Sequence, residues 1–178
     1  FGNGLSATIS AEQPVVRRTA LVGGVYAGTQ WPDVVANLRI DQAWGSAQVM
    51  GAAHQVRAMD AATPVLFDTD EFGYAVGGGV TVNLPMLGKG DSISAQVAYA
   101  KGAMSYVGSG LGTGFAIASG WPVVTSAAAG VVVDGVVTGG GTGIELTTGW
   151  SVVGGFQHSW NPNWKTSLYG TYGAINYS

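Results

Sequence analysis

The chain has 178 residues, a formal net charge of −3 and no cysteine, and charged residues make up only 10% of it. A typical soluble domain carries roughly 25% charged residues, so this composition indicates a surface that does not face water everywhere. The length suits a single domain, 1–178, the absence of cysteine excludes disulfides and cysteine-based metal sites, and the absence of a basic run argues against a nucleic-acid partner.

Seven stretches of the chain alternate strictly between apolar and polar residues, which is the pattern of β-strands with two different faces. In chain order they are 5–12, 34–44, 46–56, 73–84, 92–100, 146–159 and 164–173. In the second stretch, for example, Leu38 and Ile40 alternate with Arg39 and Asp41. The sequence therefore predicts an all-β chain.

The connections between these stretches are alternately long and short. The long ones precede residue 34, occupy 57–72 and run through the Gly-rich segment 102–145, whereas the short ones are the turn at Gly45, 85–91 and 160–164. Outer-membrane barrels have short periplasmic turns and long extracellular loops. We therefore expect an antiparallel up-and-down meander that forms part of a transmembrane β-barrel.

Charged and aromatic residues fall where a membrane barrel requires them. Within the strand bodies, the charged residues Glu12, Arg39, Asp41 and Lys165 all occupy the polar face. A basic residue that faced lipid at mid-depth would cost roughly 2–4 kcal/mol. Aromatic residues that suit an interfacial girdle lie at the strand ends: Trp44, Tyr99, Trp150, Trp160, Trp164 and Tyr172.

Neither a membrane-spanning helix nor an enzyme site is indicated. A spanning helix needs about 20 consecutive apolar residues, but the nearest candidate, 121–141, contains Asp134 and several glycines. The two histidines, His54 and His158, cannot supply metal-ligand spacing by themselves, and no nucleophile motif is present. The glycine-rich 108–114 lacks the Lys-Ser/Thr of a phosphate loop, so we expect a loop there and no catalysis, cofactor or metal.

Arg39 is the leading candidate for a functional residue, because it lies near the middle of a strand on the face expected to meet a water-filled lumen. Wall charges of this kind set ion selectivity in channels. Asp41 follows on the same face, although a salt-bridged pair that only hydrates the wall is the competing interpretation. The other residues expected to line the pore are Asn37, His54, Gln48, Asn83, Gln96, Gln157 and Lys165.

Among these residues, His54 is expected to be a hydrated wall residue that could titrate near neutral pH. Four further cations are expected outside the pore. Arg57 and Lys101 fall on the lipid-facing parity beyond the strand bodies, where we expect an interface or loop. Arg17 and Arg18 lie in the first long loop, where a lipopolysaccharide contact is conceivable.

Three segments resemble the general porins of alphaproteobacteria: NGLSATISAE (3–12), PDVVANLRIDQAWGSAQ (32–48) and WSVVGGFQHSWNPNWKTSLYG (150–170). The resemblance implies a barrel of 16 strands that assembles as a homotrimer in the bacterial outer membrane, in contact with its lipid and lipopolysaccharide. It implies passive passage of ions and small hydrophilic solutes. With about seven strands visible, the resemblance further implies a fragment without the N-terminal strands, the constriction loop and the final strands.

Two other interpretations remain open at the level of sequence. A non-conducting outer-membrane barrel that acts as a structural anchor or adhesin would share the alternation and the loop asymmetry, but would not need charges in its lumen. A soluble extracellular β-sandwich would pack its apolar strand faces on each other. Dependence of the folded state on detergent would separate the sandwich from both barrels.

Overall fold

The computed structural model describes residues 3–60, 68–107 and 132–177. Its long strands are β1 (Leu5–Glu12), β4 (Asp33–Gln42), β5 (Gly45–Met59), β6 (Asp68–Asn83), β7 (Ser92–Lys101), β10 (Thr148–Asn161) and β11 (Trp164–Asn176). Its short elements are η1 (Pro14–Arg17), β2 (Leu21–Val22), β3 (Val25–Tyr26), η2 (Met104–Tyr106), β8 (Gly135–Thr138) and β9 (Gly143–Leu146).

The seven long strands form one antiparallel sheet in the order β1-β4-β5-β6-β7-β10-β11. Each of the seven alternating stretches corresponds to one of these strands, so the predicted all-β fold and meander order are confirmed. Long strands that follow each other along the chain also lie next to each other in the sheet. They pair either as hairpins, such as β4–β5, or across the two connections that carry the short elements, as in β1–β4 and β7–β10.

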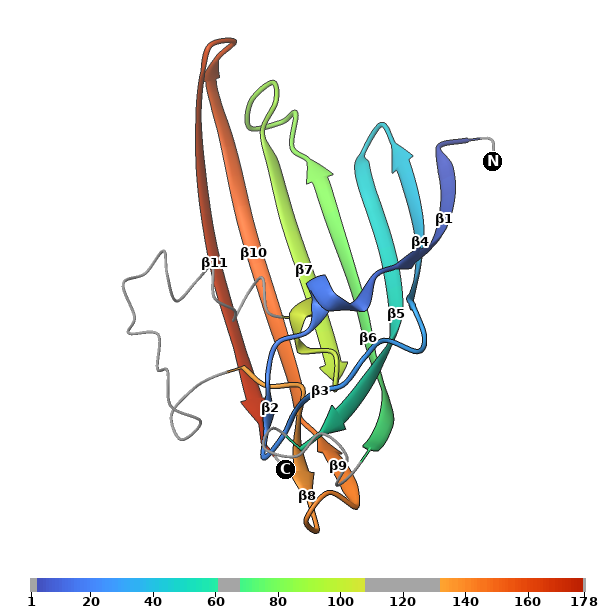
Figure 1. Cartoon of the computed structure of the whole chain (residues 1–178). Helices are drawn as coiled ribbons and strands as arrows, with labels where there is room; N and C mark the ends of the chain where they lie inside the picture. Colours follow the sequence, from blue (N-terminus) through green and yellow to red (C-terminus); the bar gives the residue numbers. More distant parts are fainter. Residues whose placement is uncertain (1–2, 61–67, 108–131, 178) are drawn as a thin grey trace.

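The two ends of the sheet differ. The turns β4–β5, β6–β7 and β10–β11 gather at one end, the short-turn end, which is uppermost in Figure 1. The longer connections leave from the opposite end, the loop end. The β4–β5 turn depends on Gly45, which has φ +142°, and a Cβ atom there would lie 1.9 Å from the carbonyl oxygen of Thr81. Only glycine fits this position.

The two longest described connections fold over one face of the large sheet (Figure 1). β2 pairs in parallel with β8, and β8 pairs with β9, which gives a second, three-stranded sheet. Leu21 and Val137 of this sheet pack with Val56 and Ala58 of β5, and η2 packs on the alanines of β5, β6 and β7. We call η1, η2 and the three-stranded sheet the inner layer; the sequence pattern predicted only loops here.

The face of the large sheet opposite the inner layer is apolar and exposed. Its side chains are the ones that alternate with the polar residues, as predicted, and Val49 and Val97 in the middle of β5 and β7 are 58% and 54% exposed. The same face carries Ile9, Val34, Leu38, Phe72, Val76, Val80, Ile93, Val152, Phe156 and Leu168, all exposed. A band of this kind is expected to be covered by lipid.

Two strands extend further toward the loop end than the alternation indicated. Arg57 lies within β5 and Lys101 is the last residue of β7, so the expectation that they fall beyond the strand bodies was wrong. The outward face is polar around Arg57. Gln55 lies on the same face and donates a hydrogen bond to Asp70 of β6 over 3.1 Å. No helix among the described residues is long and apolar enough to cross a membrane.

Candidate functional site

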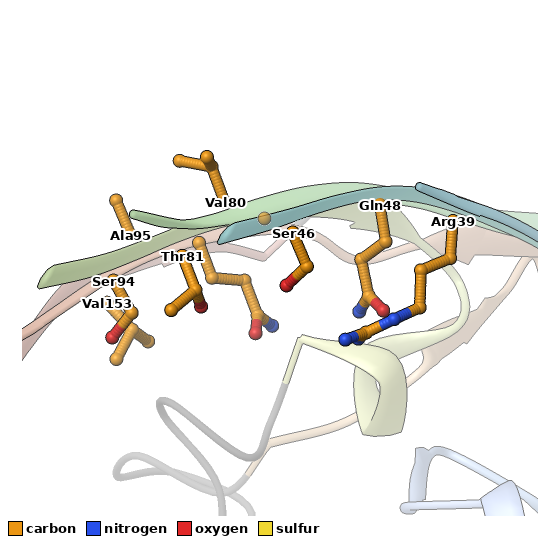
Figure 2. A pocket seen from close by; sticks show the side chains of 10 residues that line it. Arg39, Ser46, Gln48, Val80, Thr81, Ser94, Ala95 and Val153 are labelled. Atoms are coloured by element: carbon orange, nitrogen blue, oxygen red, sulfur yellow. The ribbon is translucent and has the colours of Figure 1, made fainter. Parts of the chain in front are cut away.

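The candidate site is the polar half of the inner face, next to the short turns. The register places Arg39 of β4 beside Gln48 of β5. In the same row of the sheet, Gly79 of β6 lies between Gln48 and Gln96 of β7. The next row toward the turns carries Ser46, Thr81 and Ser94. In Figure 2 the labelled polar side chains point to one side of the sheet, and Val80 and Ala95 point to the other. They line a shallow groove of about 180 Å³.

Arg39 and Asp41 form an ion pair within one strand. Residues two apart on a strand lie on the same face, and the guanidinium donates to both carboxylate oxygens, from Nε over 2.8 Å and from Nη2 over 2.6 Å. The side chains are 44% and 53% exposed. The pair therefore presents two opposite charges side by side to the water on this face.

The other predicted pore-lining residues lie on the same face but differ in surroundings. Gln157 donates to the carbonyl of Gly90 over 3.3 Å, and Asn83 donates to the carbonyl of Ala43 over 3.1 Å, so both support the short turns. Lys165 is exposed near the start of β11, and Asn37 is half-buried one row beyond Arg39. Their role as pore-lining residues stays a prediction.

His54 differs from the expectation of a hydrated wall residue. It lies on the inner face, but its side chain is fully buried, and its Nδ1 lies 2.7 and 2.9 Å from the two carboxylate oxygens of Asp33. Tyr106 of η2 donates to the same carboxylate over 3.0 Å. Burial, together with this bond to Asp33, raises the pKa of the Tyr106 hydroxyl, which keeps it a donor. The inner layer is what removes His54 from water.

Sequence reasoning missed the residues that hold the inner layer. Asp33 and Asp134 are both fully buried, and Met104 is buried among alanines. Asp134 was used only as evidence against a helix. The signal that was available is the small size of the inner-face residues at the loop end, such as Gly73 and Ala75. Such small residues leave room for a second layer.

The two arginines of the first long connection both contact aromatic rings of this chain. Arg17 forms a 2.8 Å ion pair with Glu12, and its guanidinium lies 4.9 Å from the centre of the Tyr106 ring. The hydrogen bond to Glu12 raises the pKa of Arg17. Arg18 stacks over the ring of Tyr26 at 4.7 Å. Both cations are thus engaged with residues of this chain.

The polar half of the inner face has the chemistry of a wall that meets water. In residues 3–60, 68–107 and 132–177, no group of three or more His, Asp or Glu is placed to hold a metal ion. The glycine-rich 108–114 and residues 121–131 lie outside the described residues. Amide, hydroxyl and paired ionic groups on one face, with aliphatic groups on the other, suit a barrier between lipid and an aqueous passage.

A comparison with family models agrees with this geometry. The family described as the porin subfamily matches residues 1–178, the whole chain. The chain belongs to the porin subfamily. Neither the comparison with curated proteins nor the comparison with solved structures gave a match.

Membership explains the two faces of this porin. Porins are channel-forming proteins of the bacterial outer membrane and are not an enzyme family. The apolar outward face suits contact with lipid, and the polar inward face suits contact with the water of a channel. The resemblance of its three segments to porins is confirmed by the match over the full chain.

Proposed function

We propose that this porin is a general diffusion channel, which passes ions and small hydrophilic solutes through a water-filled lumen. The observation that carries the proposal is the row of polar side chains Arg39, Gln48 and Gln96 on β4, β5 and β7, which is interrupted only by Gly79 on β6. Polar groups of several kinds in an open groove favour passage over tight binding.

We propose that the seven-stranded sheet is one arc of a larger barrel. β1 and β11 each have a sheet partner on one side only within the described part of the chain. Open edges are not stable in lipid, so further strands must close the wall. The general porins that the sequence resembles suggest 16 strands and a homotrimer, with lipid and lipopolysaccharide around its outer surface, and we extend both features to this chain as proposals.

The test is single-channel recording on the full-length porin in a planar bilayer. Arg39→Ala leaves Asp41 without its partner, so the reversal potential in a salt gradient should shift toward cation selectivity. Asp41→Asn leaves Arg39 and should shift it the other way. Lys89→Ala removes a cation from the exposed β6–β7 turn and serves as the matched control, with little change expected.

The outcomes separate three interpretations. Stepwise conductance in groups of three with opposite shifts for the two variants supports a trimeric diffusion channel with the ion pair in its passage. Conductance that neither variant alters keeps the channel but reduces the pair to hydration of the wall. A folded, membrane-inserted porin without conductance would refute the diffusion role and leave the non-conducting anchor.

A further inference from the structure

The outward face of the large sheet carries an apolar groove near the middle of its strands. The floor of the groove is Gly78 of β6, where the missing side chain leaves a gap between Val49 of β5 and Val97 of β7. The groove has a volume of about 510 Å³ and extends to Trp150 of β10. A Cβ atom at Gly78 would lie no closer than 3.4 Å to any neighbour, which is an ordinary contact. The fold therefore allows a larger residue at Gly78, and the gap is a property of this surface.

Aromatic side chains mark the end of the groove that lies toward the loop end. Tyr99 and Trp150 are exposed and line the groove there. The ring of Tyr74 lies 6.1 Å from that of Tyr99, and the ring of Tyr172 lies 5.7 Å from that of Trp150. In membrane barrels, such aromatic residues lie at the boundary between the hydrocarbon and the headgroups. The groove thus begins at this boundary and runs toward the middle of the lipid band.

A polar row crosses the same face just beyond these aromatic residues. Lys101 is two residues beyond Tyr99 on β7, so it lies on the same face and about 7 Å closer to the loop end. The register places it between Tyr74 of β6 and Thr148 of β10, with Asn176 of β11 next in the row. All four side chains can donate hydrogen bonds. β7, β10 and β11 contain no Asp or Glu, so the row offers a positive charge without a neighbouring acid.

A cation above an apolar groove fits a molecule with a phosphate at the membrane boundary and an acyl chain below it. Lysine binds phosphate as a point charge. The carboxylate of Asp70 lies outside the row, because it is four residues from Tyr74, about 13 Å along β6. Outer-membrane barrels carry their long loops outside the cell, which would place this end of the groove in the outer leaflet. The outer leaflet consists of lipopolysaccharide, and its lipid A portion carries phosphates and several acyl chains.

We propose that Lys101 and the groove at Gly78 form a binding site for lipid A. Lys101 contacts a phosphate, with Thr148 and Asn176 as further donors, and one acyl chain lies in the groove over Gly78. This inference deepens the contact with lipopolysaccharide given under the proposed function, and it rests on the placement of this porin in the outer membrane. It does not rest on conductance.

Titration with lipid A tests the phosphate contact. The full-length porin is purified in detergent, and native mass spectrometry follows the binding of diphosphoryl lipid A. Lys101→Met keeps the length of the side chain but removes its charge, and should weaken binding several-fold, whereas Lys101→Arg should retain it. Lys89→Met removes a lysine from the β6–β7 turn at the opposite end and should bind like the unsubstituted porin. Lipid A without phosphates should bind the unsubstituted porin and Lys101→Met equally weakly.

A second pair of variants tests the groove. Gly78→Leu fills the gap between β5 and β7, so it should weaken the binding of lipid A several-fold. Gly154→Leu is the matched control, because Gly154 lies on the same face of β10 but outside the groove, with no atom within 4 Å of a Cβ placed there. Both variants add the same apolar side chain to the outward face. A difference between them therefore reports on the groove and not on general contact with lipid.

Several results would overturn the site. Binding that neither Lys101→Met nor Gly78→Leu weakens would refute it, and so would equally tight binding of lipid A with and without phosphates. Displacement of lipid A by an equal concentration of phosphatidylglycerol would refute the assignment to lipid A. If the expected binding pattern is found in a porin that conducts nothing, the diffusion function fails and the lipid site stands. If the porin conducts but every variant binds lipid A equally, the function stands and the site fails.

Discussion

Asp91 shows how a single buried carboxylate joins two short turns. It lies in the β6–β7 turn, is almost fully buried, and accepts a 2.9 Å hydrogen bond from the backbone N–H of Ser159 on β10. Its second oxygen lies 2.8 Å from Nδ1 of His158. The bond from Ser159 first, and then the one from His158, lower the pKa of Asp91 below its ordinary value. Ionised Asp91 therefore stabilises the folded state.

The sign of the pH effect follows from this lowered pKa. Asp91 contributes its stabilisation at pH values above the ordinary carboxyl range of about 4, and the contribution is lost as the pH falls through the lower pKa of the folded state. We expect Asp91→Asn to lower the melting temperature by several degrees at pH 7 and by clearly less near pH 3. Circular dichroism melts in detergent would measure this.

The matched control for Asp91→Asn is Glu145→Gln, which neutralises an exposed carboxylate of β9. Its melting temperature should stay close to that of the unsubstituted porin at both pH values. An Asp91→Asn variant that loses as much stability at pH 3 as at pH 7 would contradict an ionised Asp91 as the cause.

At the scale of one residue, the sequence could predict which face of the sheet a side chain occupies, but not whether that side chain is buried. Arg39 and His54 share the inner parity, and both were expected to be wet. The difference arises from the inner layer, because Tyr106 of η2 donates to Asp33, the carboxylate that also contacts His54. Nothing in the period of β5 indicates that contact.

At the scale of an element, β7 shows the two faces most clearly. Val97 points outward and is 54% exposed, and its neighbour Gln96 lines the inward groove. Both lie near the middle of the strand, which runs from Ser92 to Lys101. If one face meets lipid and the other meets water, the same substitution at the two positions must have very different costs.

Arginine is the substitution that separates the faces of β7. Val97→Arg places a charge in the lipid band and should destabilise the inserted porin by roughly 2–4 kcal/mol if the position is at mid-depth. Gln96→Arg is the matched variant and should fold almost normally, because its charge faces water. Urea unfolding in lipid vesicles would compare the two, and equal losses would argue against a lipid-facing outer surface.

The alternation of β7 also explains which elements the sequence could predict. A long strand between lipid and water must change polarity at every residue, so all seven long strands were found. β2 and β8 pair over only two residues, and η2 has a single turn. None of these elements is long enough to show a hydrophobic period in its sequence. Their positions depend on the hydrogen bonds of Asp134 and on the packing of η2 against alanines of the large sheet. Both are features of the tertiary structure.

At the scale of the whole molecule, the porin has two layers with different construction. The large sheet consists of neighbouring strands paired along the chain, and its meander order was foreseeable from the alternation of short and long connections. The inner layer lies over one face of the large sheet and contains the described parts of two connections (Figure 1).

The hydrogen bond from Thr19 to Asp134 spans 115 positions of the chain, and the one from Tyr106 to Asp33 spans 73. Closing such distances costs more chain entropy than forming a hairpin, and contacts of long sequence separation form slowly. We therefore expect the large sheet to pair first and the inner layer to form late in folding. Ala75 packs against η2, so the thiol of an Ala75→Cys variant becomes inaccessible to a maleimide only when the inner layer forms. During refolding into vesicles, this protection should appear later than the circular dichroism signal of the sheet. Simultaneous appearance of both signals would contradict this order.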